Sequence, residues 1–114
     1  MGAANLEAET DARLDTVFGA LAHRTRRAML QALCEGPAAV TQLAAPHDMT
    51  LPAASKHVRV LERAGLVRRE VNGRVHRCSL EAGPLRDVEQ WVEHYREFWS
   101  DALEALARYV EDDA

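Results

Sequence analysis

Apolar residues recur at helical spacing in two short runs between residues 39 and 66, with polar residues between them. The apolar positions are Val40, Leu43 and Ala44 in the first run and Ala54, Val58 and Leu61 in the second. Spacings of three and four residues place each set on one face of a helix. The segment Pro46-His47-Asp48 interrupts the period between the runs. The pattern therefore predicts two short helices joined by a tight turn.

The second helix of this pair carries its own start and stop signals. Thr50 precedes the run, and its hydroxyl can accept a backbone N–H of the first turn. Pro52 falls in that turn, where a missing N–H does no harm, so it favours helix initiation. Gly65 follows at the position where helices often end in a left-handed residue. The other faces of this helix hold Ser55, Lys56, Arg59 and Arg63.

Two further helices are predicted on the N-terminal side of this pair. Residues 1–10 are interpreted as a flexible tail. Thr10 or Asp11 can cap a helix that runs through about Ala22, because apolar residues then recur at i, i+3, i+4 and i+7. A second helix is expected over residues 24–35, where a Gly-Pro pair ends it.

After Gly65 the period changes from helical to alternating. The runs LVRREV and RVHRCSL flank Asn72-Gly73, which is a strong hairpin signal. With these two residues as the turn, the facing pairs are Val71 and Arg74, Arg69 and His76, and Val67 and Cys78. The same register puts Arg68 opposite Arg77, and like charges across a strand pair are unfavourable. We therefore expect a basic hairpin with a phosphate nearby, and a solvated edge of a small sheet is the alternative.

A long amphipathic helix is predicted over residues 84–110. Its large apolar residues alternate at spacings of three and four, which is the pattern of a heptad seam. The seam consists of Leu85, Val88, Val92, Tyr95, Trp99, Ala102, Leu106 and Tyr109. So small a domain cannot cover this stripe, and large aromatic residues are enriched at interfaces. The seam is therefore the predicted interface of a homodimer, with the acidic residues of the helix facing outward.

Composition and charge restrict the class of protein. The 114 residues with 47% hydrophobic content indicate one folded domain, which we place over residues 11–114. The predicted helices and hairpin make its fold class mainly α with a small β-hairpin. The net charge of −4 is unevenly distributed. Residues 53–78 hold seven basic and two acidic residues, whereas residues 79–114 hold three basic and ten acidic residues. Binding of a polyanion depends on the local potential, so the first segment favours a nucleic-acid contact.

The basic segment coincides with the second helix of the pair and with the hairpin. In a helix–turn–helix the second helix enters the DNA major groove, and its N-terminal half reaches base edges. We therefore predict double-stranded DNA as the partner. The predicted contacts are Thr50, Pro52, Ala53, Ser55, Lys56, His57, Arg59, Arg63, Arg68, Arg74 and Arg77. For His57, packing beside the groove and direct contact are both open. For the cluster Arg24, Arg26 and Arg27, a solvated helix face and a phosphate contact are both open.

Four segments carry a resemblance to a known family. They are LDTVFGALAHRTRRAML, LPAASKHVRVLERAGLV, the basic Asn-Gly hairpin and PLRDVEQWVEHYREFW. In these segments the chain resembles the ArsR/SmtB family of bacterial winged helix–turn–helix repressors, from Leu14 to Tyr109. The resemblance implies a homodimer joined by its terminal helices, a recognition helix in the major groove and the hairpin as a wing. His23-Arg24 replaces a frequent Asp-Pro, which weakens that helix start, and Leu51 replaces a frequent Gln.

Metal sensors of this family use motifs that this chain does not match. Thiolate sensors carry a C-x-C type motif, but residues 40–45 contain no cysteine. Zinc sensors use Asp, His and Glu of the terminal helices, and here Asp87 lies only seven residues before His94. His94 and Glu97 have a workable i, i+3 spacing, so weak metal binding there stays open. We expect no metal and no other cofactor.

The chain shows no sign of catalysis or of export. Ser55 and His57 stand at i, i+2 on a helix, so their side chains diverge and cannot form a nucleophile–base pair. Cys34 and Cys78 lie far apart in apolar contexts, where a thiol is normally inert, although a redox role stays open. The sequence lacks a secretory signal and a run of roughly 20 apolar residues, which favours a cytoplasmic protein.

The expected function is that of a homodimeric, sequence-specific transcriptional regulator. We expect a repressor that binds a pseudo-palindromic operator and blocks a promoter sterically. The alternative is a helical protein–protein adaptor that docks another protein through the winged domain and the aromatic C-terminal helix. The heptad seam fits either function, whereas the basic helix and hairpin favour DNA. The sequence leaves the small-molecule effector open.

Overall fold

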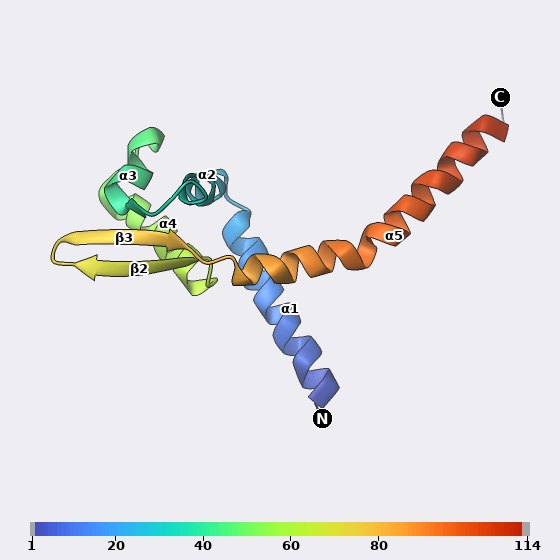
Figure 1. Ribbon diagram of the computed structural model, residues 1–114, viewed down its shortest axis with the longest axis horizontal. Coiled ribbons are helices and arrows are strands. Elements are labelled where there is room, and N and C mark those ends of the chain that lie inside the picture. Colours follow the sequence, from blue (N-terminus) through green and yellow to red (C-terminus); the bar gives the residue numbers. More distant parts are fainter. Residues whose placement is uncertain (1, 113–114) are drawn as a thin grey trace.

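The computed structural model describes the backbone of residues 2–112 and the side chains of residues 8–112. Short helices pack beside a small sheet, and one long helix leaves this domain and extends away from it (Figure 1). The elements are α1 (Gly2–Leu21), α2 (Arg24–Leu33), β1 (Ala38–Ala39), α3 (Val40–Ala44), the 3-10 helix η1 (Ala45–His47), α4 (Leu51–Arg63), β2 (Val67–Asn72), β3 (Val75–Leu80) and α5 (Gly83–Asp112). The predicted fold class, mainly helical with a β-hairpin and a long C-terminal helix, is confirmed. None of the described helices is long and apolar enough to cross a membrane.

The four helices α1, α2, α3 and α4 share one hydrophobic core with the start of the hairpin. The largest fully buried side chains are Val17, Met29, Val58, Leu61, Leu66 and Cys78. The predicted apolar faces of α3 and α4 are confirmed, because all six of their residues are buried. The turn between these helices contains Asp48 with φ 47°, a left-handed conformation that short polar residues tolerate. The predicted helix pair therefore packs on the core, and the buried face of α4 fixes the rotation of this helix about its own axis.

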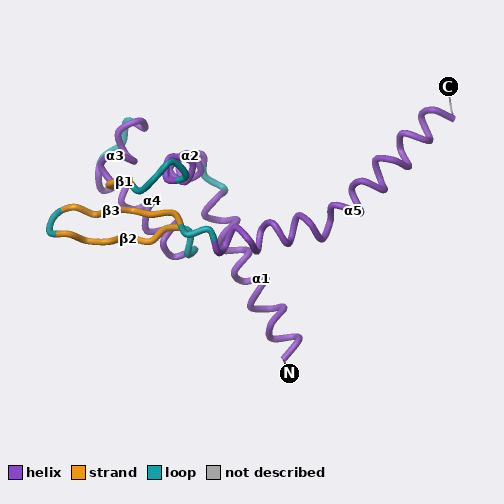
Figure 2. Tube along the Cα trace, viewed as in Figure 1, coloured by secondary structure: helices purple, strands orange, loops and turns teal. Residues whose placement is uncertain are grey.

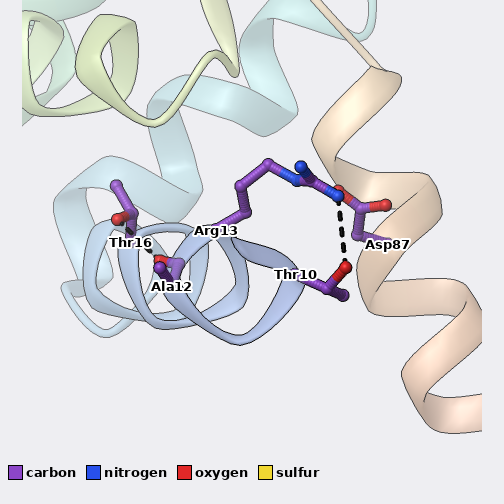
Figure 3. A network of polar contacts seen from close by, with 5 residues as sticks. All are labelled: Thr10, Ala12, Arg13, Thr16 and Asp87. Atoms are coloured by element: carbon purple, nitrogen blue, oxygen red, sulfur yellow. Dashed lines mark hydrogen bonds and ion pairs between the residues drawn. The ribbon is translucent and has the colours of Figure 1, made fainter. Parts of the chain in front are cut away.

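α1 begins earlier than predicted. Its backbone is already helical at Gly2, so a start capped by Thr10 or Asp11 is wrong. Instead, the Thr10 hydroxyl accepts a hydrogen bond from Nη2 of Arg13 at 3.3 Å, within the helix. Nε of Arg13 also lies 3.6 Å from a carboxylate oxygen of Asp87 on α5 (Figure 3). This ion pair between an exposed Arg13 and a half-buried Asp87 joins α1 to the first turns of α5.

The basic cluster at the start of α2 serves to end α1. Nε and Nη2 of Arg26 donate to the carbonyls of Ala20 and Gly19 at 2.7 and 3.1 Å, and Nη1 of Arg27 donates to Leu21 at 2.6 Å. The last carbonyls of a helix have no partners within it, so arginines near them stabilise its C-terminus. Neither interpretation from the sequence anticipated this role. Arg24 is exposed.

The start of α2 has a cap that the sequence did not predict. Nδ1 of the His23 ring accepts the backbone N–H of Thr25 at 3.2 Å, with His23 in an extended conformation. An acceptor at the N-cap satisfies one of the free N–H groups of the first turn. His23 therefore supplies the cap at the position where similar chains often have Asp.

The sheet has three antiparallel strands in the order β1-β3-β2, and β1 was not predicted because it is only two residues long (Figure 2). The predicted hairpin register is wrong: Val67 pairs with Leu80, Arg69 with Cys78, Val71 with His76 and Asn72 with Val75. The turn residues are Gly73 and Arg74, and of these only Gly73 has positive φ, at 62°. An Asn-Gly turn of type I′ would need positive φ at both central residues, whereas a turn with Gly first does not.

α5 leaves the domain after its first turns. Leu85 and Val88, both predicted in the dimer interface, are half-buried against the core of their own chain. Every residue from Glu89 to Asp112 is exposed. The radius of gyration is 19.1 Å, whereas a compact domain of this length has roughly 13 Å. The described chain is therefore an extended protomer with much apolar surface on its long helix.

Gly65 closes α4 and turns the chain toward the wing. Its φ of 74° is left-handed, and the N–H of Leu66 reaches the carbonyl of Leu61 at 3.0 Å, as expected for this helix end. A Cβ at Gly65 would also meet Cγ of Pro84 at 3.3 Å, at the start of α5. The predicted helix stop is confirmed, and it lies where α4, the hairpin and α5 meet.

We predict that Gly65→Ala destabilises the protein by about 1–2 kcal/mol, because an L-residue is strained in the left-handed region. Urea unfolding at one fixed protein concentration measures this change. Gly83→Ala is the matched control, since a Cβ there meets nothing within 4 Å and the backbone is not left-handed. Equal unfolding midpoints for the two variants would contradict the strained conformation.

Candidate nucleic-acid interface

α4 has one buried and one exposed face, and the exposed face carries most of the predicted contacts. The Thr50 hydroxyl accepts the N–H of Ala53 at 3.2 Å, and Pro52 lies in the first turn, so the predicted helix start is confirmed. Outside the core are Thr50, Pro52, Lys56, Arg59 and Arg63, all exposed. Ala53, Ser55 and His57 are half-buried. The helix therefore presents three free cationic side chains on a surface that a groove can approach.

His57 packs inward rather than toward solvent. Its ring centroid lies 4.5 Å from that of His23, and its Nδ1 lies 3.2 Å from Nη1 of Arg26. Arginine can only donate, so Nδ1 accepts this hydrogen bond and the ring is neutral in this arrangement. Burial, together with the nearby charges of His23, Arg26 and His47, lowers the pKa of His57. These contacts favour the packing interpretation of His57.

Arg69 connects α4 to the wing, which we define as residues 67–80. Nη2 of Arg69 donates to Oε1 of Glu62 at 2.6 Å, and Nη1 lies 3.1 Å from Nδ1 of His76. The Arg69 side chain is 12% exposed, and its Nε is buried without a hydrogen-bond partner. Arg69 shares a strand face with the buried Val67, so the alternation of the strand already hinted that it points inward. Its charge fixes the wing and is not free on the surface.

The outer surface of the wing is basic but without the predicted repulsion. Arg77 lies opposite Glu70, and Arg68 lies opposite Ser79, so the expected pair of facing arginines is wrong. Nε of Arg68 is 3.6 Å from Oε1 of Glu81 in an exposed ion pair. Such pairs contribute little and are screened by salt, so Arg68 can exchange this partner. Arg74 is exposed in the turn at the wing tip.

A cleft of about 340 Å³ separates the start of α4 from the wing. It is lined by Ala39, Val40, Thr41, Leu51, Ser55, Arg69, Arg74, Val75 and His76. The cleft thus brings Ser55 and Arg74, two predicted contacts from different elements, into one concave surface. Leu51 and Val75 were not among the predicted contacts, although both are about half exposed. Helical spacing places Leu51 in line with Ala54, Val58 and Leu61, so no signal in the sequence marked it as exposed.

The arrangement matches known DNA-binding proteins. A family model for a helix–turn–helix domain matches residues 21–70. The chain is similar to the HTH-type transcriptional regulator Rv2034 of Mycobacterium tuberculosis, with 32% identity over 99 residues, which cover 87% of this chain and 90% of the relative. It is also similar to the crystal structure of an ArsR family transcriptional regulator, with 43% identity, a TM-score of 0.75 and coverage of 79% of this chain and 93% of that one. The chain belongs to the ArsR family of winged helix–turn–helix transcriptional regulators.

A further similar structure comes from Mycobacterium bovis. The chain is similar to the solution structure of a homodimeric winged helix–turn–helix DNA-binding domain, Mb0332 from Mycobacterium bovis. The two chains are 26% identical, with a TM-score of 0.59, and the match covers 92% of each. This ArsR-family protein has the fold of transcriptional regulators with a helix–turn–helix DNA-binding domain, and its homologues are such regulators.

The two cysteines of this ArsR-family protein lie in different environments. Cys78 is fully buried, and burial raises the pKa of its thiol. A raised thiol pKa disfavours the reactive thiolate, in agreement with the inert behaviour expected of it. Cys34 is exposed, so the apolar context inferred for it from the sequence is wrong. His94 and Glu97 are exposed on α5.

We predict that the free energy of unfolding falls as the pH is lowered through and below about 6.5, the usual pKa of histidine. His57 has a lowered pKa in the folded protein, so the unfolded chain binds the proton more readily in that range. Its contribution to stability is therefore fully present above pH 6.5 and is lost as the pH falls. Urea unfolding between pH 7.5 and 5.5 measures the slope.

His57→Gln should flatten this dependence on pH, whereas His94→Gln, an exposed change on α5, should leave it intact. The same slope in the wild type and in His57→Gln would show that other groups dominate the effect.

Proposed function

We propose that this ArsR-family regulator is a homodimeric repressor that binds a pseudo-palindromic operator and occludes promoter DNA. α4 is the recognition helix and enters the major groove. The wing contacts phosphates and the adjacent minor groove. The observation that carries the proposal is the segregation of charge: exposed basic side chains gather on α4 and the wing, while α5 is acidic and apolar.

The exposed face of α4 suits base reading near its N-terminus. Ser55, Lys56 and Arg59 lie in the half of the helix that reaches base edges in such complexes. Lys and Arg donate to guanine O6 and N7, and phosphates accept from the same groups with less geometric demand. Arg74 at the wing tip, with Arg68 and Arg77 behind it, is better placed for phosphates. We therefore assign specificity to α4 and salt-dependent affinity to the wing.

α5 supports assembly of two copies. Its exposed apolar residues include Val92, Tyr95, Trp99, Leu106 and Tyr109 of the predicted seam, and Trp91, Phe98, Leu103 and Val110 beside it. Phe18 of α1 joins this surface, since its ring lies 5.4 Å from that of Trp91 in an edge-to-face arrangement. A patch of this size on a single chain usually marks an interface. The homodimeric state of the Mb0332 neighbour supports a second copy of this chain as the partner.

Charge orients such a dimer relative to DNA. The exposed acidic residues Glu89, Glu93, Glu97, Asp101 and Glu104 on α5 would be repelled by phosphates. α5 therefore lies away from the groove, and the two α4 helices reach successive major grooves about 10 base pairs apart. A dimer in this position covers promoter DNA and competes with other proteins for it.

We predict that Lys56→Ala or Arg59→Ala costs on the order of 1–3 kcal/mol on the operator and much less on random DNA. Arg74→Ala should weaken both kinds of binding to a similar extent and reduce the salt slope by about one unit per lost phosphate contact. Binding to operator and random duplexes at several salt concentrations measures both effects.

Arg86→Ala, which removes an exposed charge on α5, is the control and should leave DNA binding unchanged. Loss of specific and non-specific affinity in equal proportion for all α4 variants would show that this helix does not read bases. If unrelated DNA competes as well as any selected sequence, the adaptor function gains support instead.

We predict that Trp99→Ala weakens the dimer by at least about 2 kcal/mol, as expected for an aromatic residue central to an interface. Trp99 is 59% exposed in the single chain, so the protomer should remain folded. Sedimentation measures the association, and Glu93→Ala on the acidic face is the matched control. A wild-type protein that is monomeric at micromolar concentration would refute the proposed interface.

A further inference from the structure

The first residue of the recognition helix is an exposed leucine. Leu51 is 50% exposed, whereas Val58 and Leu61, the other large aliphatic residues on the core side of α4, are fully buried. Leu51 is not needed to hold the helix on the core. It lines the cleft between α4 and the wing, together with Ser55 one turn later. Its apolar surface is thus available at the N-terminal end of α4.

The first turn of α4 has little else with which to read a base. The Thr50 hydroxyl already accepts the N–H of Ala53. Pro52 has no N–H and an apolar ring, and the half-buried Ala53 has no polar side chain. Hydrogen-bonding side chains begin only at Ser55 and Lys56, in the second turn. Readout by the first turn is therefore apolar in character.

Only one of the four DNA bases offers an apolar group in the major groove, because thymine alone carries a methyl at C5. We propose that Leu51 reads a thymine in each operator half-site through contact with this methyl group. The inference rests on the proposed entry of α4 into the major groove. At the first residue of α4, a polar side chain would select a base through hydrogen bonds. Leu51 would instead select a base through its methyl group.

The wing side of the cleft can meet the DNA backbone. Arg74 and His76 line the cleft from the wing, together with the apolar Val75. Arg74 is exposed and can donate to a phosphate, whereas Arg69, which also lines the cleft, is held by Glu62. The cleft thus brings Leu51 of the helix and an exposed cation of the wing into one surface.

Replacing thymine by deoxyuridine removes the methyl alone and tests this contact on the DNA side. Operators are first selected from random duplexes with the wild-type protein, and each thymine is then replaced in turn. Loss of one buried methyl group predicts about four-fold weaker binding when the sensitive thymine is replaced in one half-site. Replacing it in both half-sites predicts about fifteen-fold weaker binding. A cytosine at that position should regain affinity when it is replaced by 5-methylcytosine.

The protein side uses Leu51→Ala, with Val71→Ala as the matched aliphatic control. Val71 is 57% exposed on the wing but does not line the cleft. Leu51→Ala should bind thymine and uracil operators equally at the sensitive position, whereas Val71→Ala should still discriminate. Circular dichroism establishes that both variants are folded.

Sequence-selective binding in which no thymine is sensitive, or in which Leu51→Ala still discriminates, would overturn the inference and leave the proposed function intact. Failure to select any sequence would instead contradict the proposed function, and the methyl contact with it. The two failures are therefore separate results of the same experiment.

Discussion

The burial of one face of α4 decides what the rest of the molecule can do. Ala54, Val58 and Leu61 are fully buried, which fixes the rotation of the helix about its axis. The other positions of α4 are then fixed on its remaining faces, and Lys56 and Arg59 face outward. A core that holds one short helix firmly is a precise way to present a few side chains, because interiors are closely packed and resist small shifts.

Much of this arrangement follows from local rules and could be predicted from the sequence. The helical spacing around Val58, the cap at Thr50 and the stop at Gly65 each act within a few residues, and each appears as expected. The predicted hairpin register was wrong because Gly73 can be the second residue of an Asn72-Gly73 turn or the first residue of a Gly73-Arg74 turn. Only the observed backbone shows that Gly73 comes first. β1 is fixed by pairing with a distant strand, which no local pattern reveals.

The roles of the arginines were harder to predict, because their partners are remote in sequence. Arg26 and Arg27 bind carbonyls at the end of the preceding helix, and Arg69 binds Glu62 across the junction of α4 and the wing. In a sequence these residues look the same as Arg59 or Arg74. Because these arginines already have partners, the basic surface that remains free is smaller and is concentrated at α4 and the wing tip. The candidate site is thus narrower than the sequence suggested.

Arg26 also makes a mechanical connection between parts of the protein with different tasks. Its single guanidinium binds two carbonyls at the end of α1 and, through Nη1, the ring of His57 on α4. The donors of a guanidinium are fixed in one plane, so these groups cannot move independently without losing hydrogen bonds. α1 packs against both α4 and α5, so a tilt of α1 would reach α4 through this guanidinium as well as through direct contact. In the proposed dimer, the angle at which the two subunits meet and the reach of their recognition helices would then change together.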